Sequence, residues 1–292
     1  MNPASDAPGE GRGIPGIQGP SSLSAADFAR LAKFIESELG IRMPETKRIM
    51  LESRLQKRIR HFGMSGFTEY VDFVFSPKGR ESELINMIDA VTTNKTDFFR
   101  EADHFDYLLE SILPELSGRG GSAAFWSAGC STGEEPYTLA MVLEEYRDAA
   151  DPRFNYRILA SDLSTQVLDK AKAAVYDEEK AAPIPMSYKK KYLLRSKDHG
   201  QGLVRIKPEL RAKVGFARIN FMDERYPVEG LFDVVFCRNV IIYFERPVQE
   251  MILGRLCRHV RKDGWLILGH SETLTGMDLP LRVVAPTIYK RL

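Results

Sequence analysis

Four short apolar runs constrain the fold of this chain most strongly: AAFWSAG, RILASD, FDVVFCRN and WLILGH. Each run ends in a small or polar residue, and helical patterns separate most of them. An alternation of strands and helices predicts an α/β fold, in which a largely parallel sheet has helices on both faces. Ligand-binding side chains are then expected beyond the carboxyl ends of the strands.

The chain before these runs has a different character. Its start is rich in glycine and proline and poor in residues that could be buried, which predicts a disordered tail over residues 1–20. Apolar residues then recur at helical spacing, as in Phe28, Leu31 and Ile35. Further helices are predicted over about residues 45–61, 67–75 and 81–91. We therefore predict a helical domain over residues 21–90 and a sheet domain over residues 91–292.

The sequence after Asp162 is less regular than the rest of the sheet domain. A helix is predicted over residues 166–175, and a basic segment with prolines follows it. The next stretch, GLVRIKPELRAKVGFARIN, contains short alternating patterns that are typical of strands. This is more chain than a crossover between parallel strands needs. We predict a small inserted β-subdomain at about residues 176–216.

Composition narrows the classes of function. The 292 residues carry a net charge of only +1, which gives no global attraction to nucleic acid or to a membrane. No apolar run approaches the roughly 20 residues of a membrane span, and the start of the chain lacks the pattern of a signal peptide. The three cysteines form no CxxC pair, and the five histidines do not cluster at metal spacing. We expect a cytoplasmic protein with reduced cysteines and no metal.

The stretch FWSAGCSTGEEPYTLA, at residues 125–140, predicts a cofactor loop between a strand and a helix. Glu134 and Glu135 would repel the pyrophosphate that a dinucleotide places at such a helix N-terminus, and the pattern G-x-G-x-x-G is absent. S-adenosylmethionine has no phosphate, and its amino group and sulfonium both suit a glutamate. The loop therefore favours S-adenosylmethionine over NAD. Alternatively, the two glutamates only complement the dipole of the helix.

The end of the second predicted strand, RILASD, carries an acidic residue. Asp162 at this place could bind both ribose hydroxyls of an adenosine. It could equally be the N-cap of the helix that follows. Together with the glutamate-bearing loop, it supports an adenosine cofactor.

These stretches, with TTNKTDFFREADHF upstream and FCRNVIIYF and GHSE downstream, resemble the CheR family of chemotaxis receptor methyltransferases. The resemblance covers residues 24–292. It implies S-adenosylmethionine-dependent enzymes that esterify glutamate side chains on the cytoplasmic helices of chemoreceptors, with S-adenosylhomocysteine as the second product. It also implies a class I methyltransferase sheet with an N-terminal helical domain and a small β-subdomain.

The resemblance further implies which residues bind the cofactor. They are Asn94, Thr96, Arg100, Glu135, Asp162, Asn220, Phe221, Cys237, Arg238 and Asn239. In the family pattern Glu135 binds the methionine amino group and Asp162 binds the ribose. Asn220 and Phe221 border the adenine, whereas residues 237–239 form the floor near the methionyl group. Asn94 and Thr96 have a second interpretation, as caps of a helix that starts near residue 97.

Arg100 and Tyr243 face the methyl group in the family and are the predicted catalytic residues. Without the family pattern, Arg100 would be read as a surface ion-pair partner and Tyr243 as a core aromatic residue. A glutamate carboxylate has a reference pKa of about 4.3, so it is ionised at pH 7 and needs no general base. The expected contribution of the enzyme is alignment and desolvation of this nucleophile.

Recognition of the receptor is predicted on the second helix, TKRIMLESRLQKRIRHF. Its basic residues are Lys47, Arg48, Arg54, Lys57, Arg58 and Arg60. A basic helix is most often a solvated face, but the helices that carry the target glutamates are acidic and would suit it. In the family the β-subdomain can also bind a C-terminal receptor peptide as an added strand. Nothing in the sequence indicates an obligate oligomer, so a monomer is expected.

Two other functions remain open at this point. A nucleic-acid methyltransferase would share the cofactor loop, but it would normally show a broader basic surface or a Pro-Pro-aromatic motif. A non-catalytic receptor-binding homologue would have lost Arg100, Glu135, Asp162 or Tyr243, and all four are present.

Overall fold

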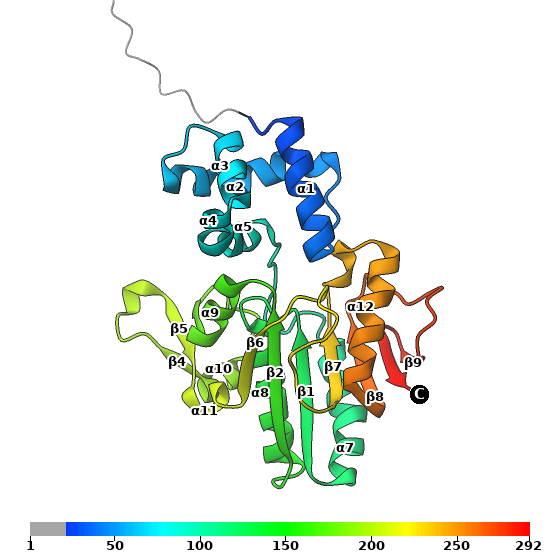
Figure 1. The fold of residues 1–292 in the computed structure, drawn as a ribbon. Coiled ribbons are helices and arrows are strands. Elements are labelled where there is room, and N and C mark those ends of the chain that lie inside the picture. Colours follow the sequence, from blue (N-terminus) through cyan, green and yellow to red (C-terminus); the bar gives the residue numbers. More distant parts are fainter. Residues whose placement is uncertain (1–21) are drawn as a thin grey trace, which may run out of the picture.

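The computed structural model describes residues 22–292, and the tail predicted over residues 1–20 lies outside them. A helical domain stands above the carboxyl ends of the strands of an α/β domain (Figure 1). Its elements are α1 (Ala25–Leu39), η1 (Glu45–Lys47), α2 (Arg48–Phe62), α3 (Phe67–Phe75), α4 (Pro77–Ser82) and α5 (Leu84–Val91). No described helix is both long and apolar enough to cross a membrane.

Helix α1 shows how the sequence forms this domain. Ser24 caps its first turn, because the Ser24 side chain accepts a hydrogen bond from the Asp27 amide at 3.1 Å. Phe28, Leu31 and Ile35 are buried in the core of the domain, as the periodicity predicted. Gly40 ends the helix with φ +70°, and a Cβ there would lie 2.5 Å from the Met222 sulfur. The end of α1 therefore packs closely against the α/β domain.

Two helix predictions were wrong in detail. The helix expected over residues 45–61 begins with the separate turn η1, and the helix expected over residues 81–91 is the last part of a bent pair, α4 and α5. The bend lies at Glu83. Ser76 caps α4 and Pro77 occupies its first turn, so this helix starts directly after α3 ends.

The α/β domain is built on a seven-stranded sheet with the order β6-β2-β1-β7-β8-β10-β9. Its strands are β1 (Ser122–Ala128), β2 (Asn155–Asp162), β6 (Val214–Arg218), β7 (Phe232–Cys237), β8 (Val260–Leu268), β9 (Leu281–Ala285) and β10 (Ile288–Arg291). β10 is antiparallel to both β8 and β9, whereas the other neighbours are parallel. The predicted α/β sheet is confirmed.

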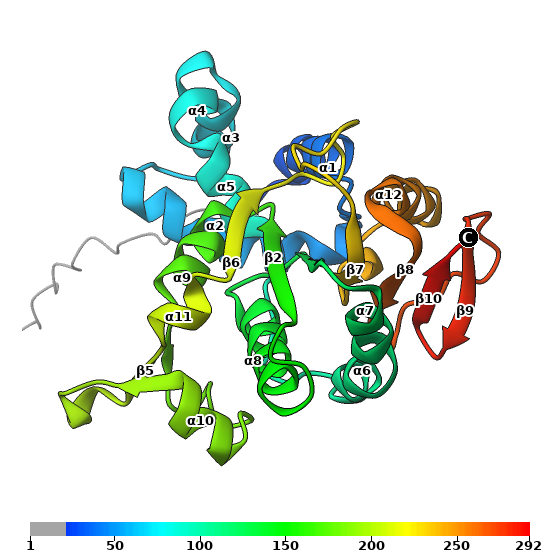
Figure 2. The ribbon, with the colours of Figure 1, turned by 90° about the horizontal axis from the view of Figure 1, so that it is seen from below.

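Helices cover both faces of this sheet (Figure 2). One face bears α6 (Asp103–Tyr107), the π-helical turn η2 (Leu108–Ile112), α7 (Leu113–Arg119) and α8 (Glu134–Ala149), and the other bears α12 (Arg246–His259). Phe125 and Trp126 are successive residues of β1, and they enter the two opposite cores, because side chains alternate along a strand. The apolar run of β1 is therefore buried on both faces.

The insert after α9 (Thr165–Ala173) forms a three-stranded antiparallel sheet with the order β3-β5-β4. It contains β3 (Val175–Asp177), α10 (Met186–Tyr192), β4 (Leu193–Arg195), η3 (His199–Gln201), β5 (Leu203–Ile206) and α11 (Pro208–Arg211). It projects sideways from the large sheet (Figure 1). The range expected for it, residues 176–216, also took in the start of β6, which pairs with β2 and belongs to the large sheet.

Candidate functional site

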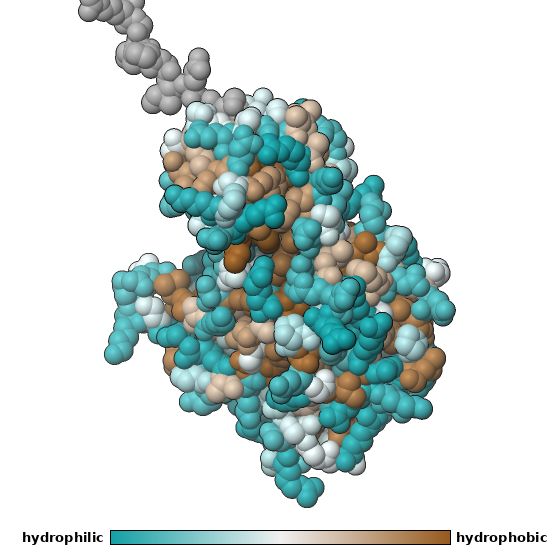
Figure 3. Space-filling model, viewed as in Figure 1, coloured by the Kyte–Doolittle hydropathy of each residue, from teal (hydrophilic) through white to brown (hydrophobic). Residues whose placement is uncertain are grey.

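A cleft of about 910 Å³, part of it open to solvent, lies where the helical domain meets the carboxyl ends of the strands. Apolar surface is visible at this junction in Figure 3. Ten of the predicted site residues line the cleft: Asn94, Thr96, Arg100, Glu135, Asp162, Asn220, Phe221, Arg238, Asn239 and Tyr243.

Cys237 is the predicted site residue that the structure leaves outside the cleft. It is the last residue of β7, it has no exposed surface, and it packs in the core on the α12 face of the sheet. The next residue, Arg238, does reach the cleft. Because strand residues point alternately to opposite faces, the thiol lies behind the floor and the guanidinium lies in it.

The loop between β1 and α8 is held in a conformation that the sequence indicated only in part. Gly129 and Gly133 have φ +91° and +97°, and Ser131 between them has φ +48°. A Cβ on Gly129 would lie 2.4 Å from Val240 Cγ2. The glycine therefore allows the loop to approach the loop after β7, which lines the same cleft.

The two adjacent glutamates of this loop have different environments. Glu135 lines the cleft, where its Oε1 accepts from Ser127 Oγ at 2.6 Å and its Oε2 accepts from Arg238 Nε at 2.8 Å. Glu134 accepts from the Thr132 hydroxyl and lies 3.7 Å from Lys180 Nζ, and burial raises its pKa. Only Glu135 is therefore directed at the cleft.

Asp162 connects two of the loops around the cleft. Its Oδ2 accepts from the Ser131 amide at 2.9 Å, and its Oδ1 accepts from the Ser164 amide at 3.0 Å. The N-cap of α9 is Ser164, so the interpretation of Asp162 as that cap was wrong. Burial raises the pKa of Asp162, and its carboxylate lines the cleft with lone pairs to spare.

Arg238 forms the centre of a buried network beneath the cleft. Its Nε donates to Glu135, and its Nη1 donates to the Arg100 carbonyl at 2.8 Å and lies 3.0 Å from His104 Nδ1. The guanidinium carbon is 5.1 Å from the ring centre of Phe105. The guanidinium thus ties the strand-end loop to the segment that carries Arg100.

Sequence reasoning quoted the GHSE motif but gave no role to Glu272, which organises the loop after β7. This buried carboxylate accepts backbone hydrogen bonds from Gly269 at 2.7 Å, Asn239 at 2.9 Å, Val240 at 2.8 Å and Ile241 at 2.8 Å. Asn239 has φ +58°, a conformation that costs energy for a non-glycine residue and needs such support. Glu272 therefore fixes the backbone between Arg238 and Tyr243.

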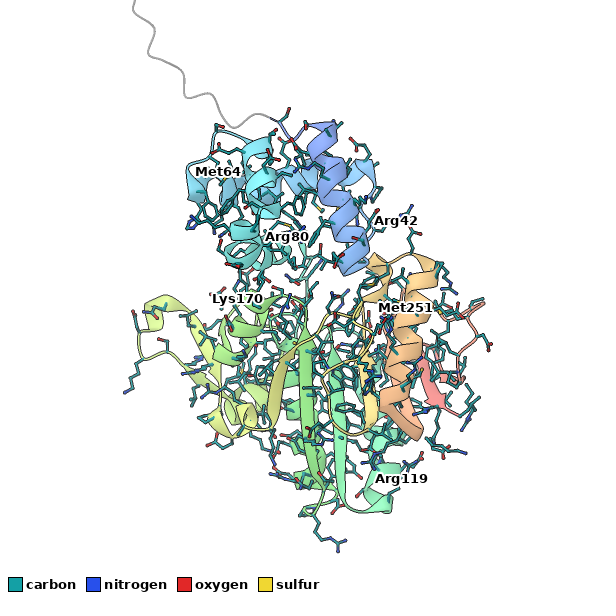
Figure 4. The ribbon with its side chains drawn as sticks, viewed as in Figure 1. Arg42, Met64, Arg80, Arg119, Lys170 and Met251 are labelled. Carbon is teal, nitrogen blue, oxygen red and sulfur yellow. The ribbon has the colours of Figure 1, made fainter. Side chains whose placement is uncertain are left out.

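Arg100 and Tyr243 line the same cleft from different segments. Arg100 Nη1 donates to the Lys95 carbonyl at 3.2 Å, and 31% of its side chain is exposed. Tyr243 is half-buried, and its carbonyl accepts from the Arg42 amide at 2.9 Å, at the junction where Figure 4 labels Arg42. The Tyr243 hydroxyl makes no hydrogen bond within residues 22–292. Both side chains are therefore accessible to a ligand.

The helical domain and its linker supply lining residues that sequence reasoning missed. They are Leu39, Ile41, Thr92, Thr93 and Lys95. Thr92 and Thr93 belong to the quoted stretch TTNKT, so the motif itself was the available signal. Residues 93–97 are not helical, so the interpretation of Asn94 and Thr96 as helix caps was wrong.

The predicted basic surface of the second helix is only partly a surface. Arg54 donates to the Thr92 carbonyl at 2.9 Å and to the Thr93 hydroxyl at 2.9 Å, which fixes the linker. Arg58 forms two hydrogen bonds with Glu83, whose side chain is fully buried. Arg54 and Arg58 are therefore partly covered and already engaged by the linker and by Glu83, and their predicted contact with the receptor stays a prediction. Of the other four, Lys57 and Arg60 are exposed, whereas Lys47 and Arg48 are partly covered.

Glu101, His104 and His270 are close enough to hold a metal ion, with ligand atoms within 4.8 Å of one another. Arg238 Nη1, however, lies 3.0 Å from His104 Nδ1 and 3.6 Å from Glu101 Oε2. The guanidinium takes up the Nδ1 lone pair of His104 and neutralises Glu101, and its charge would repel a cation held between them. We interpret the cluster as a hydrogen-bond network.

Comparison with known proteins covers almost the whole chain. A family profile described as "CheR methyltransferase, all-alpha domain" matches residues 26–92, and one described as "CheR methyltransferase, SAM binding domain" matches residues 94–289. The chain is 38% identical over 275 residues to the "Chemotaxis protein methyltransferase" of Borreliella burgdorferi, which covers 92% of this chain and 95% of the relative. It is 37% identical over 268 residues to that of Escherichia coli (strain K12), with coverages of 92% and 91%. The chain belongs to the CheR methyltransferase family.

Proposed function

We propose that this chain transfers the methyl group of S-adenosylmethionine to glutamate side chains on the cytoplasmic helices of chemoreceptors, giving methyl esters. Its relatives are named chemotaxis protein methyltransferases. The observation that carries the proposal is the single cleft that brings Glu135 and Asp162 together with Arg100 and Tyr243. Two carboxylates suit a cationic cofactor, and an arginine beside a tyrosine hydroxyl suits an anionic nucleophile.

The lining of the cleft fits S-adenosylmethionine. Glu135 would accept a hydrogen bond from the amino group, since each of its oxygens still has a lone pair after Ser127 and Arg238 are satisfied. Asp162 would accept from the ribose hydroxyls. Asn220 and the buried Phe221 would border the adenine, with Leu39 on the same lining. When bound, the cofactor supplies an electrophilic methyl group.

The remaining cofactor-binding residues complete this assignment. Asn94, Thr96 and Asn239 would contact the methionyl part from the linker and from the loop after β7. Arg238 would act on the same part through Glu135. Cys237 would only support the floor from behind, because it is fully buried.

Catalysis would depend on positioning. The substrate carboxylate is already ionised at neutral pH, so Arg100 would bind one of its oxygens and the Tyr243 hydroxyl would donate to it. Both groups orient the carboxylate in line with the bond that breaks. His104 is unsuited to act as a base, because it is buried and both of its ring nitrogens have partners.

Receptor recognition would use charge and a free strand edge. Lys57 and Arg60 on α2 are exposed and form no ion pair within residues 22–292, so they would face acidic receptor helices. β4 is an outer strand of the small sheet, and a groove beside it is lined by Met186, Leu193 and Arg195, among others. A C-terminal receptor peptide would bind there as an added strand.

The test is transfer of a labelled methyl group from S-adenosylmethionine to membranes that contain chemoreceptors. We expect label in the receptor that is released by mild base, as a carboxyl ester is, and strongly reduced label with Arg100→Ala. Base-stable label in nucleic acid would contradict the proposal. Tight binding of S-adenosylhomocysteine without any transfer would instead indicate a non-catalytic homologue.

A further inference from the structure

A continuous chain of hydrogen bonds leads from the β9–β10 turn at the surface to the buried carboxylate of Glu135. Thr287 Oγ1 donates to the Pro286 carbonyl at 2.8 Å and lies 2.8 Å from His104 Nε2. His104 Nδ1 lies 3.0 Å from Arg238 Nη1, and Arg238 Nε donates to Glu135 at 2.8 Å. His104 itself is 1% exposed.

The pattern of donors fixes the protonation of the ring. Because a guanidinium can only donate, His104 Nδ1 must be the acceptor in its pair with Arg238, and the neutral ring then carries its hydrogen on Nε2, which donates to Thr287 Oγ1. His104 Nδ1 is then the unprotonated nitrogen, which accepts from the arginine. A protonated ring would instead place a second donor and a second positive charge against Arg238. Burial, with Arg238 as the second cause, lowers the pKa of His104 to about 4.

His104 is one of the groups that determine the orientation of the Arg238 fork. Nε faces Glu135, and Nη1 has three neighbouring acceptors: the Arg100 carbonyl, the Glu101 carbonyl at 3.4 Å and His104 Nδ1. The two carbonyls lie on one short segment around Glu101, which has φ +54°. His104 contributes the acceptor that comes from a side chain packed in α6.

We infer that His104 is a positioning residue: its neutral imidazole holds Arg238 so that the guanidinium presents the Glu135 carboxylate to the amino group of S-adenosylmethionine. This inference rests on the role proposed above for Glu135. It gives His104 no part in proton transfer. Substitution of His104 should therefore weaken binding of the methionine end of the cofactor and leave binding of the adenosine end unchanged.

Two substitutions separate the two ring nitrogens. His104→Asn places an amide oxygen near the position of Nδ1 and keeps an acceptor for Arg238. His104→Gln reaches the position of Nε2 and keeps the contact with Thr287, but it leaves Arg238 without this acceptor. Both remove the ring, so the melting temperature of each variant is measured as a control for general damage. Glu135→Gln is the reference for loss of the amino-group contact.

The readout is the affinity for two ligands, measured by calorimetry. S-adenosylhomocysteine has the amino acid end, whereas 5′-methylthioadenosine lacks it. With His104→Gln we expect about tenfold weaker binding of S-adenosylhomocysteine, the effect of misplacing one charge-assisted contact, and less than about twofold change for 5′-methylthioadenosine. His104→Asn should stay within about threefold of the parent for both ligands.

Three results would overturn the inference. In the first, His104→Gln binds S-adenosylhomocysteine as tightly as the parent, whereas Glu135→Gln binds it more weakly. This result would contradict the role of His104 and leave the proposed function intact. The second is an equal loss for both ligands, or an equal effect of the Asn and Gln variants, since either would indicate a general packing role. In the third, Glu135→Gln leaves the ratio of the affinities for S-adenosylhomocysteine and 5′-methylthioadenosine unchanged. This result would also contradict the proposed role of Glu135.

Discussion

The two sides of the cleft are stabilised by opposite kinds of side chain. On the α/β side, buried carboxylates accept from backbone amides: Glu272 holds residues 239–241, and Asp162 holds Ser131. On the helical side, cations donate to backbone carbonyls: Arg54 holds Thr92, and Lys180 holds the Thr96 carbonyl. Arg238 holds the Arg100 carbonyl in the same way from below.

The difference follows from the local backbone. Loops at strand ends around the cleft turn through left-handed residues such as Ser131 and Asn239, and their amides need acceptors. The linker after α5 is extended, and its carbonyls at the helix end need donors. Each side is therefore fixed by long-range side chains rather than by its own secondary structure.

The largest effect is expected from the buried ion pair of the helical side. Arg58→Met leaves the Glu83 carboxylate buried without its guanidinium partner, a change that typically costs about 3–5 kcal/mol. Urea unfolding followed by circular dichroism should show this loss in the helical domain. Affinity for S-adenosylhomocysteine should also fall, because the helical domain lines the cleft.

Lys57→Met is the matched control for this change. Lys57 is the neighbouring residue of α2, carries the same charge and is exposed without an ion pair in the described chain. It should change the unfolding free energy by less than about 0.5 kcal/mol. Equal effects of the two substitutions would mean that the pair of Arg58 with Glu83 does not stabilise the domain.

The second effect separates the two catalytic candidates, because they line the cleft from different segments, Arg100 after the linker and Tyr243 after β7. Arg100→Ala should lower kcat by about 10²–10³-fold, the usual range for loss of one charge-stabilising group at a reacting oxygen. Tyr243→Phe should lower kcat by about ten- to hundredfold, since it removes a single neutral hydrogen bond. Initial rates of label transfer at saturating cofactor measure both.

If both groups bind the same substrate carboxylate, the double variant should be less impaired than the product of the two single effects. Fully multiplicative losses would mean that Arg100 and Tyr243 act on different steps. A wild-type rate for Tyr243→Phe would remove Tyr243 from the catalytic machinery and leave Arg100 as the candidate for orienting the substrate.

The sequence predicted the α/β side of the cleft better than the helical side. The topology of a parallel sheet places strand ends and glycine loops together, so Asp162 and the loop with Glu134 and Glu135 could be predicted to meet at one site. The separate roles of Glu135 and Asp162 came from the family resemblance. The helical side depends on which face of α2 is buried. Its charged residues gave no such information, and Arg54 and Arg58 were read as surface although they hold the linker and the core.

The supporting residues could not be predicted on either side. Glu272 lies 33 positions from Asn239, and His104 lies 134 positions from Arg238, so their pairing exists only in three dimensions. The left-handed conformations of Phe99, Glu101, Ser131 and Asn239 also have no signal, because these residues are not glycine. The sequence indicates which groups react but not what holds them.

The third effect concerns His104, which lies where the two sides meet. Its surroundings are Arg238 after β7, Glu101 and Asp103 at the start of α6, and His270 after β8. Burial lowers the pKa of His104 from 6.5 to about 4. At pH 7 the ring is neutral in both the folded and the unfolded chain, whereas between pH 6.5 and 4 only the unfolded chain takes up the proton. Stability from this group is therefore lost as the pH falls through this range, by about 2 kcal/mol at pH 5.

The comparison with His104→Gln isolates this contribution. Buried carboxylates with a raised pKa, such as Asp162 and Glu272, act in the opposite direction, because the folded chain takes up their protons first. Urea midpoints of the parent and of His104→Gln are measured from pH 7.5 to 4.5. The parent should lose more stability on acidification than the variant. Parallel pH profiles would mean that His104 is not buried in its neutral form.

The smallest effect is expected from the exposed charges of α2, which test whether the helical side also recognises the receptor. Reversal of Lys57 and Arg60 to glutamate removes two exposed cations without touching the linker contacts of Arg54. Single exposed charges contribute up to about 1 kcal/mol, so receptor methylation should slow by about three- to tenfold at low salt. The difference should shrink as the salt approaches 0.15 M, where the screening length is about 8 Å.

The matched control reverses Arg153 and Lys262, exposed cations at the opposite ends of the strands, and changes net charge equally. If both double variants slow methylation to the same extent, the effect is one of net charge, and recognition lies on another surface. If only the α2 variant is slower and its affinity for S-adenosylhomocysteine is unchanged, the helical side serves the receptor as well as the cofactor.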